Sequence, residues 1–239
     1  MDAGAPAPEP MRVGRRGFRA GLLATLPVLL AVGPFGLIFG VVASEAGLDI
    51  PQTLAMTALV IAGASQLATL QLLADGAPVF IAVATGAVVN LRMATYSASL
   101  AVHWQGTPLT LRALAACVLH DQSYALSVAR YQRRPDEPLS DRVGFYLGVG
   151  GLTATVWIAM TLVGATAGRS ISGTVDLGFI VPVTFIALVA PMLKGRATLL
   201  AAAAAAATSV AFAWLPYGLG LLAGAAAGIA AGLAAERRQ

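Results

Sequence analysis

The sequence predicts an all-α, polytopic helical bundle embedded in a membrane. Of the 239 residues, 58% are hydrophobic and only 11% are charged, whereas a soluble domain carries about 25% charged residues. Several apolar runs approach 20 residues, the length that an α-helix needs to cross roughly 30 Å of hydrocarbon. These Ala-, Leu- and Gly-rich runs do not alternate between polar and apolar residues, as the strands of a membrane barrel would.

The chain contains about eight candidate membrane spans, separated by stretches rich in turn-forming residues. The expected spans are 21–43, 53–74, 78–102, 109–130, 143–166, 178–193, 197–214 and 217–235. Two of them are weak, because 53–74 has a polar interruption and 178–193 is short and contains two prolines. We expect some helices to be broken or re-entrant, and seven crossings would result if one weak span did not cross.

The basic residues predict that both termini face the cytoplasm. In that orientation the inner segments hold twelve of the fifteen Lys and Arg residues, and the outer segments hold only Arg112 and Arg169. Cytoplasmic loops of membrane proteins carry such an excess of positive charge. The arginines are therefore interpreted as topology signals, and we expect no nucleic acid as a partner.

The chain is expected to contain a tail and one domain. Residues 1–17 are predicted to form a disordered cytoplasmic tail, since the first ten include three prolines, and residues 18–236 a single transmembrane transport domain. The apolar run at 22–43 is much longer than the 7–15-residue core of a signal peptide, so no cleavage is expected. A single cysteine, Cys117, excludes an intrachain disulfide or thiolate metal site, and we expect no cofactor.

Two charged residues lie inside the expected spans, Arg92 in 78–102 and Asp121 in 109–130. A charge at mid-bilayer costs from about 2.5 kcal/mol upward, so such residues face the bundle interior and usually pair. The two spans are neighbours, and the depths of these residues differ by about one and a half helical turns, which allows a salt bridge. The pair is either a structural staple or a receptor for a zwitterion, with Arg92 toward a carboxylate and Asp121 toward an ammonium group or a proton.

Other polar residues gather near this pair in the expected spans. The sequence Gly-Ala-Ser-Gln, which begins at Gly63, predicts a break in 53–74 of the kind that forms the midplane sites of many transporters. The expected substrate-binding and translocation site consists of Gly63, Ser65, Gln66, Asn90, Arg92, Tyr96, Asp121, Gln122 and Tyr124. Asp121 and His120 are the candidates for proton coupling. The alternatives are an interhelical hydrogen-bonded patch around Gln66 and an ordinary core role for His120.

Glycine spacing predicts helix contacts. Positions 220, 224, 228 and 232 are all glycine, so one face of the span 217–235 carries a smooth stripe that suits close helix packing. The spans 21–43 and 143–166 are introduced by similar sequences, GFRAGLLATLP and GFYLGVGGLTA. This similarity raises the alternative that the chain consists of two related halves.

At these residues the chain resembles a known family, the AzlC-type branched-chain amino acid permeases. The similar stretches include LPVLLAVGPFGLIFGVVASEAGL, AGASQLATLQLLADGA, VVNLRMATYSASL and DQSYALSVARY. The resemblance implies a multi-pass exporter of branched-chain amino acids in the cell (inner) membrane, working with a small hydrophobic membrane subunit of the AzlD type. The family often has Asp-Glu where this chain has Asp121-Gln122, so proton coupling here would depend on Asp121 alone.

The leading functional hypothesis is secondary export of branched-chain or other small apolar amino acids through a polar site among aliphatic side chains. The chain has no Walker A sequence, so an ion or proton gradient is the expected energy source. The alternative is a channel or a carrier for a different small solute, although one Arg–Asp pair is a poor ion filter. We expect no enzymatic activity, because Asp121 is the sole interior acid and no nucleophile motif is present.

Overall fold

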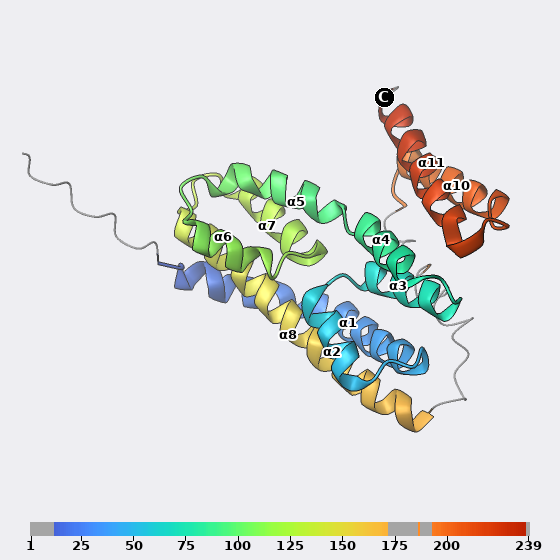
Figure 1. The fold of residues 1–239 in the computed structure, drawn as a ribbon. Coiled ribbons are helices and arrows are strands. Elements are labelled where there is room, and N and C mark those ends of the chain that lie inside the picture. Colours follow the sequence, from blue (N-terminus) through green and yellow to red (C-terminus); the bar gives the residue numbers. More distant parts are fainter. Residues whose placement is uncertain (1–11, 172–185, 187–192, 238–239) are drawn as a thin grey trace, which may run out of the picture. The chain divides into compact units, whose positions relative to one another are not determined.

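The computed structural model describes residues 12–171, 186 and 193–237, and all secondary structure in these ranges is helical (Figure 1). This confirms the all-α prediction for the described part of the chain. Apart from Ile186 and Leu193, the expected span 178–193 lies outside the described residues, and so do residues 1–11 of the expected tail.

The chain divides into two compact units. Unit 1 consists of Met1–Gly36 and Leu91–Met160, and unit 2 consists of Leu37–Asn90 and Thr161–Gln239. Each unit is described by itself below. The expectation of a single transport domain over 18–236 stays a prediction.

Some of the helices are suited to a membrane. Within the described residues, four segments are long and apolar enough to cross one: Arg15–Glu45, Val79–Trp104, Leu139–Gly168 and Leu219–Glu236. They overlap four of the expected spans. A further apolar helix, Arg196–Ala211, is shorter. The count of about eight crossings and the cytoplasmic position of both termini stay predictions.

The helices α1 (Arg15–Glu45) and α8 (Leu139–Ile171) are packed backbone to backbone. In unit 1, a Cβ atom added at Gly21 would collide with the carbonyl oxygen of Phe145. In unit 2, one added at Gly40 would collide with a carbonyl further along α8. Glycine is therefore required where these helices approach, and because the contacts advance in the same direction along both, α1 and α8 run parallel.

The N-terminal parts of α1 and α8 contact each other reciprocally. Gly21 meets the backbone of Phe145 and Val149, and Gly148 meets the backbone of Phe18 and Leu22. Phe18 and Gly21 in GFRAG match Phe145 and Gly148 in GFYLG, and Leu22 and Val149 directly follow these sequences. Two parallel helices that present the same pattern to each other form a locally two-fold symmetric contact, which gives the sequence similarity a packing role.

The chain between α1 and α8 is divided into short helices, and three of the expected spans each contain two of them or more. They are α2 (Ile50–Leu59) with α3 (Gly63–Ala74), α4 (Val79–Val89) with α5 (Arg92–Ala101) and the 3₁₀ turn η1 (Val102–Trp104), and α6 (Leu109–Ala116) with α7 (Asp121–Arg133). Three expected spans are thus interrupted, although the sequence predicts a break only in 53–74. No proline or glycine marks the other two breaks, at 90–91 and 117–120.

The break in the expected span 53–74 lies directly before the Gly-Ala-Ser-Gln sequence and not within it. The non-helical residues are 60–62, where Val60 has an extended backbone with φ −135° and ψ 93°. Gly63 begins α3, and the amide of Gln66 donates to the carbonyl of Ala62 at 2.9 Å. Gly-Ala-Ser-Gln is therefore the first turn of a helix and not the interruption itself, since the β-branched Val-Ile pair before it favours extended backbone.

Unit 2 also contains a helical hairpin (Figure 1). The hairpin consists of α10 (Arg196–Ala211), the 3₁₀ turn η3 (Pro216–Gly218) and α11 (Leu219–Glu236). Gly220, Gly224 and Gly228 are buried on α11, and a Cβ atom at any of them would press on α10. This confirms the predicted glycine stripe as a helix-contact surface.

The contact between α1 and α8 predicts that Gly21→Ala lowers stability by about 1–3 kcal/mol, because the added methyl group overpacks a backbone contact. Gly151→Ala is the matched control, since nothing lies within 4 Å of a Cβ atom at this helical position. Unfolding of the purified protein in mixed micelles, followed by circular dichroism, measures both variants. Equal stabilities of the two variants would contradict the packing role.

Candidate functional site

The pair Arg92 and Asp121 forms a direct salt bridge in unit 1. Arg92 Nη2 lies 3.1 Å from Asp121 Oδ2, so the structure brings together the two interior charges that the sequence singles out. Arg92 is the first residue of α5 and Asp121 the first residue of α7. A helix N-terminus stabilises an anion and disfavours a cation. The N-terminus of α7 thus stabilises the charge of the Asp121 carboxylate. The N-terminus of α5 does not stabilise the Arg92 guanidinium, whose charge is balanced by Asp121.

Tyr96 holds the second oxygen of the same carboxylate. Its hydroxyl group donates to Asp121 Oδ1 at 3.0 Å. Tyr96 follows Arg92 by four residues on α5, so both side chains project from one face of the helix. One oxygen of Asp121 therefore lies against a cation, and the other accepts from a neutral donor.

A second tyrosine extends this contact between α5 and α7. The rings of Tyr96 and Tyr124 are stacked, with centroids 4.1 Å apart and an interplanar angle of 7°. The Tyr124 hydroxyl donates to Ser99 Oγ at 3.2 Å. Ser99 is absent from the expected site, although its position seven residues after Arg92 on the same helical face was a usable signal.

The charge pair is accessible and incompletely paired. The exposed fraction of the side chain is 31% for Arg92 and 40% for Asp121, so another molecule can reach both. Arg92 Nε is buried and has no acceptor among the described residues. A buried donor without a partner costs about 1–3 kcal/mol. The guanidinium thus has hydrogen-bonding capacity that Asp121 does not use.

His120 serves as the N-cap of α7. Its Nδ1 atom accepts from the amide of Ser123 at 3.3 Å, and the Ser123 hydroxyl accepts from the His120 amide at 3.0 Å, which is a reciprocal capping box. Its Nε2 atom lies 3.3 Å from the carbonyl oxygen of Gly150, which can only accept. The ring thus donates through Nε2, and Gln122 Oε1 lies 3.1 Å from Nδ1. Both ring nitrogens of this buried histidine have structural contacts.

The remaining expected site residues lie in unit 2. Ser65 donates to the carbonyl of Gly86 at 2.7 Å, and Gln66 Nε2 donates to Thr57 Oγ1 at 3.0 Å. Gln66 and Thr57 are fully buried. The sequence gives no signal for a contact between Thr57 and Gln66. The non-helical residues 60–62 separate them, so helical spacing does not predict which residues share a face. Gly63 begins α3 next to this bond.

Two amide oxygens in unit 2 are buried without a donor. They are Gln66 Oε1 and Asn90 Oδ1, and neither has a partner among the described residues. Asn90 ends α4, and the chain passes into unit 1 at Leu91. The expected site thus separates into a group from unit 2, with Gly63, Ser65, Gln66 and Asn90, and a group from unit 1 around Arg92 and Asp121. A combined site stays a prediction.

The site offers acceptors, donors and aromatic rings but no cluster of metal ligands. No group of three or more His, Cys, Asp and Glu side chains that could hold a metal occurs in the described ranges. Cys117 is exposed at the break after α6. The chemistry available in unit 1 is recognition of a cation and an anion placed close together.

Comparisons with known proteins agree with the membrane assignment. A family model described as AzlC protein matches residues 27–171, a range that includes every expected site residue. An uncharacterized membrane protein of Archaeoglobus fulgidus is 30% identical over 185 residues, which are 75% of this chain and 77% of the relative. Inner membrane protein YgaZ of Escherichia coli is 26% identical over 213 residues, 85% of this chain and 83% of the relative. No solved structure matches.

The capping contacts predict that His120→Ala destabilises the protein by about 1 kcal/mol more than His120→Asn. Both variants lose the imidazole and its contact with Gly150, but an asparagine side chain can still accept from the Ser123 amide. Reversible unfolding in mixed micelles gives the two free energies. A cap role is wrong if the two substitutions have the same cost.

Proposed function

This chain belongs to the AzlC family of membrane proteins, and we propose on this premise that it is a secondary transporter exporting branched-chain or other small apolar amino acids. The family is a transporter-type membrane family and not an enzyme family. One relative is named an inner membrane protein, which supports a multi-pass location in the cell (inner) membrane. The proposal includes a small AzlD-type membrane subunit as partner.

The observation that carries the proposal is the accessible ion pair Arg92–Asp121 in a chain of low charge. An amino acid is a zwitterion with no net charge. It can insert between the two residues, so that its carboxylate binds Arg92 and its ammonium group binds Asp121. Each charge then exchanges one partner for another, and neither is left unpaired.

Both ends of the substrate find further contacts in this arrangement. A carboxylate binds a guanidinium through two parallel hydrogen bonds, and Arg92 Nε is an unused donor for the second bond. The ammonium group at Asp121 would lie near the rings of Tyr96 and Tyr124, whose faces attract cations.

Coupling to a proton gradient is proposed to act through Asp121. Protonation neutralises the carboxylate and frees Arg92 to bind a substrate carboxylate, and loss of the proton restores the charge that binds the ammonium group. Tyr96 can hold the neutral acid in place as well as the anion. The contacts of His120 are those of a helix cap, so its expected role in proton coupling has less support than that of Asp121, and Gln122 cannot carry a proton.

Transport of labelled leucine and valine into inverted membrane vesicles that contain both subunits tests the proposal. Uptake should exceed that of empty vesicles and increase with an imposed pH gradient. Arg92→Gln should reduce uptake about 10–100-fold, since it removes a charge-assisted hydrogen bond. Arg133→Gln, an exposed arginine near the end of α7, is the matched control and should transport normally. The proposal fails if wild-type uptake equals that of empty vesicles.

A second variant separates coupling from binding. Asp121→Asn keeps an acceptor for the Tyr96 hydroxyl group but cannot take up a proton. The uptake that remains should therefore no longer respond to the pH gradient, whereas the Arg133→Gln control should respond like the wild type. A gradient response that survives Asp121→Asn would remove Asp121 from the coupling step.

A further inference from the structure

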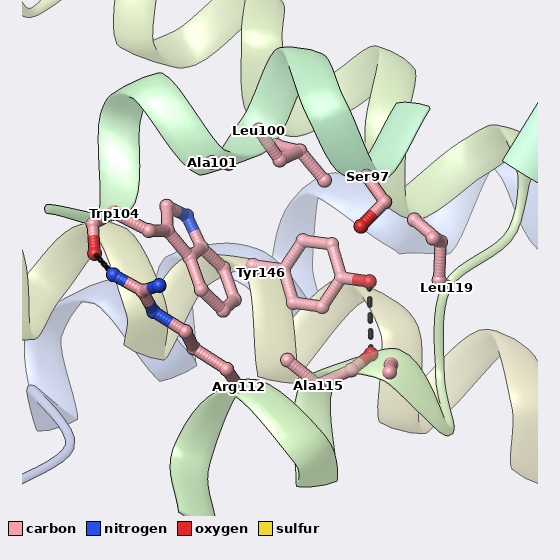
Figure 2. A pocket seen from close by; sticks show the side chains of 9 residues that line it. Ser97, Leu100, Ala101, Trp104, Arg112, Ala115, Leu119 and Tyr146 are labelled. Carbon is pink, nitrogen blue, oxygen red and sulfur yellow. Dashed lines mark hydrogen bonds between the residues drawn. The ribbon is translucent and has the colours of Figure 1, made fainter. Parts of the chain in front are cut away.

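Unit 1 contains a cavity that the ion pair does not account for. The cavity has a volume of about 90 Å³ and lies between α5, η1, α6 and α8. Figure 2 shows its lining, with Arg112 and Trp104 together at one end and Leu119 and Ser97 at the other. Neither Arg92 nor Asp121 contributes to it. The cavity is thus a feature separate from the proposed zwitterion site.

The walls of the cavity are preformed and present hydrocarbon. Leu100, Trp104, Ala115 and Tyr146 are each at most 6% exposed. The Tyr146 hydroxyl donates to the carbonyl of Ala115 at 3.0 Å, and the Trp104 indole donates to Tyr131 at 3.3 Å. Because these polar atoms are already paired, the wall offers a ligand mainly apolar surface.

Rigid ring packing keeps this wall in place. The indole of Trp104 meets the ring of Tyr146 edge to face, with centroids 4.9 Å apart and an interplanar angle of 86°. Edge-to-face pairs are favoured by the charge distribution of aromatic rings. The apolar surface therefore does not need to reorganise before a ligand binds, which lowers the cost of binding.

Arg112 places a positive charge at one end of this apolar cavity. Its Nη2 atom donates to the carbonyl oxygen of Trp104 at 3.0 Å (Figure 2). The salt bridges among the described residues are Arg92–Asp121 and Arg130–Glu137, and neither involves Arg112. A guanidinium group has five donor hydrogens in a planar fork. This exposed cation is given no carboxylate by the described part of the chain, so its remaining donors can bind an anion.

We propose that this cavity is a binding site for short aliphatic carboxylates. The carboxylate binds the guanidinium of Arg112, and the hydrocarbon chain packs against Leu100, Ala115 and Tyr146. An engineered cavity of about 150 Å³ in another protein accepts benzene, so one of this size suits a smaller group, roughly three or four carbons. The lining contains no acid for an ammonium group, which distinguishes this site from the ion pair.

The proposal requires binding and not transport, so it goes beyond the proposed function. The same carboxylate chemistry has two sources, a free carboxylic acid and the carboxylate end of an amino acid in transit. If leucine competes with a simple branched acid for the cavity, the source is an amino acid in transit. If the branched acid binds without competition from leucine, the source is a free carboxylic acid. Either result supports the site.

The test is direct binding to the purified full-length protein, with Trp104 as the reporter. The other two tryptophans, Trp157 and Trp214, are replaced by phenylalanine, so that the fluorescence comes from the cavity wall. We expect 3-methylbutanoate to change the fluorescence saturably, and 3-methylbutylamine and acetate to give no saturable change. An equal response to the amine and the acid would overturn the proposal. Should the double substitution unfold the protein, calorimetry with the unmodified chain measures the same three ligands.

Two variants probe the two ends of the site. Arg112→Gln removes the cation, and Ala116→Leu adds volume from an exposed lining position. Each should weaken binding of 3-methylbutanoate by about tenfold or more, while Arg133→Gln should bind it as the wild type does. Normal binding by both folded variants would overturn the site. Vesicles that show no amino acid transport would refute the proposed function and leave this binding result unaffected.

Discussion

A charge cannot remain alone in hydrocarbon, and this constraint organises unit 1. Arg92 and Asp121 meet at 3.1 Å, and each lies at the start of a separate short helix. The N-terminal amides of α7 favour the carboxylate, whereas α5 disfavours a cation at its start. The pairing of α5 with α7 follows, and Tyr96 and Tyr124 reinforce it with a hydrogen bond and a ring stack.

Interrupted helices make this pairing available to a ligand. In a continuous helix the backbone amides near residue 121 would be bonded within the helix, and His120 could not act as a cap. The interruption at 117–120 exposes these groups and lets His120 and Ser123 satisfy them. The partly exposed Asp121 is thus held at a helix start, in contact with both Arg92 and Tyr96.

The parallel helices α1 and α8 provide a contrasting contact in unit 1. Their contact is made by glycines on both sides, so its geometry is fixed by backbone atoms and tolerates little change. The buried faces of α8 also supply Tyr146 to the Arg112 cavity and the Gly150 carbonyl to His120. One helix therefore supports the cap of α7 and the wall of the cavity.

The sequence by itself determined the helical membrane class and the glycine contact on α11, and it allowed the pairing of Arg92 with Asp121. These follow from composition, a four-residue spacing and the rule that the only two interior charges must meet. Tertiary structure alone decided the helix breaks at 90–91 and 117–120 and the hydrogen bond from Tyr96 to Asp121. It also decided the cavity beside Arg112, a residue that the sequence marks only as a topology signal. The physical reason is that a helix end, a hydrogen bond and a cavity each depend on partners distant in the chain, whose positions no local pattern records.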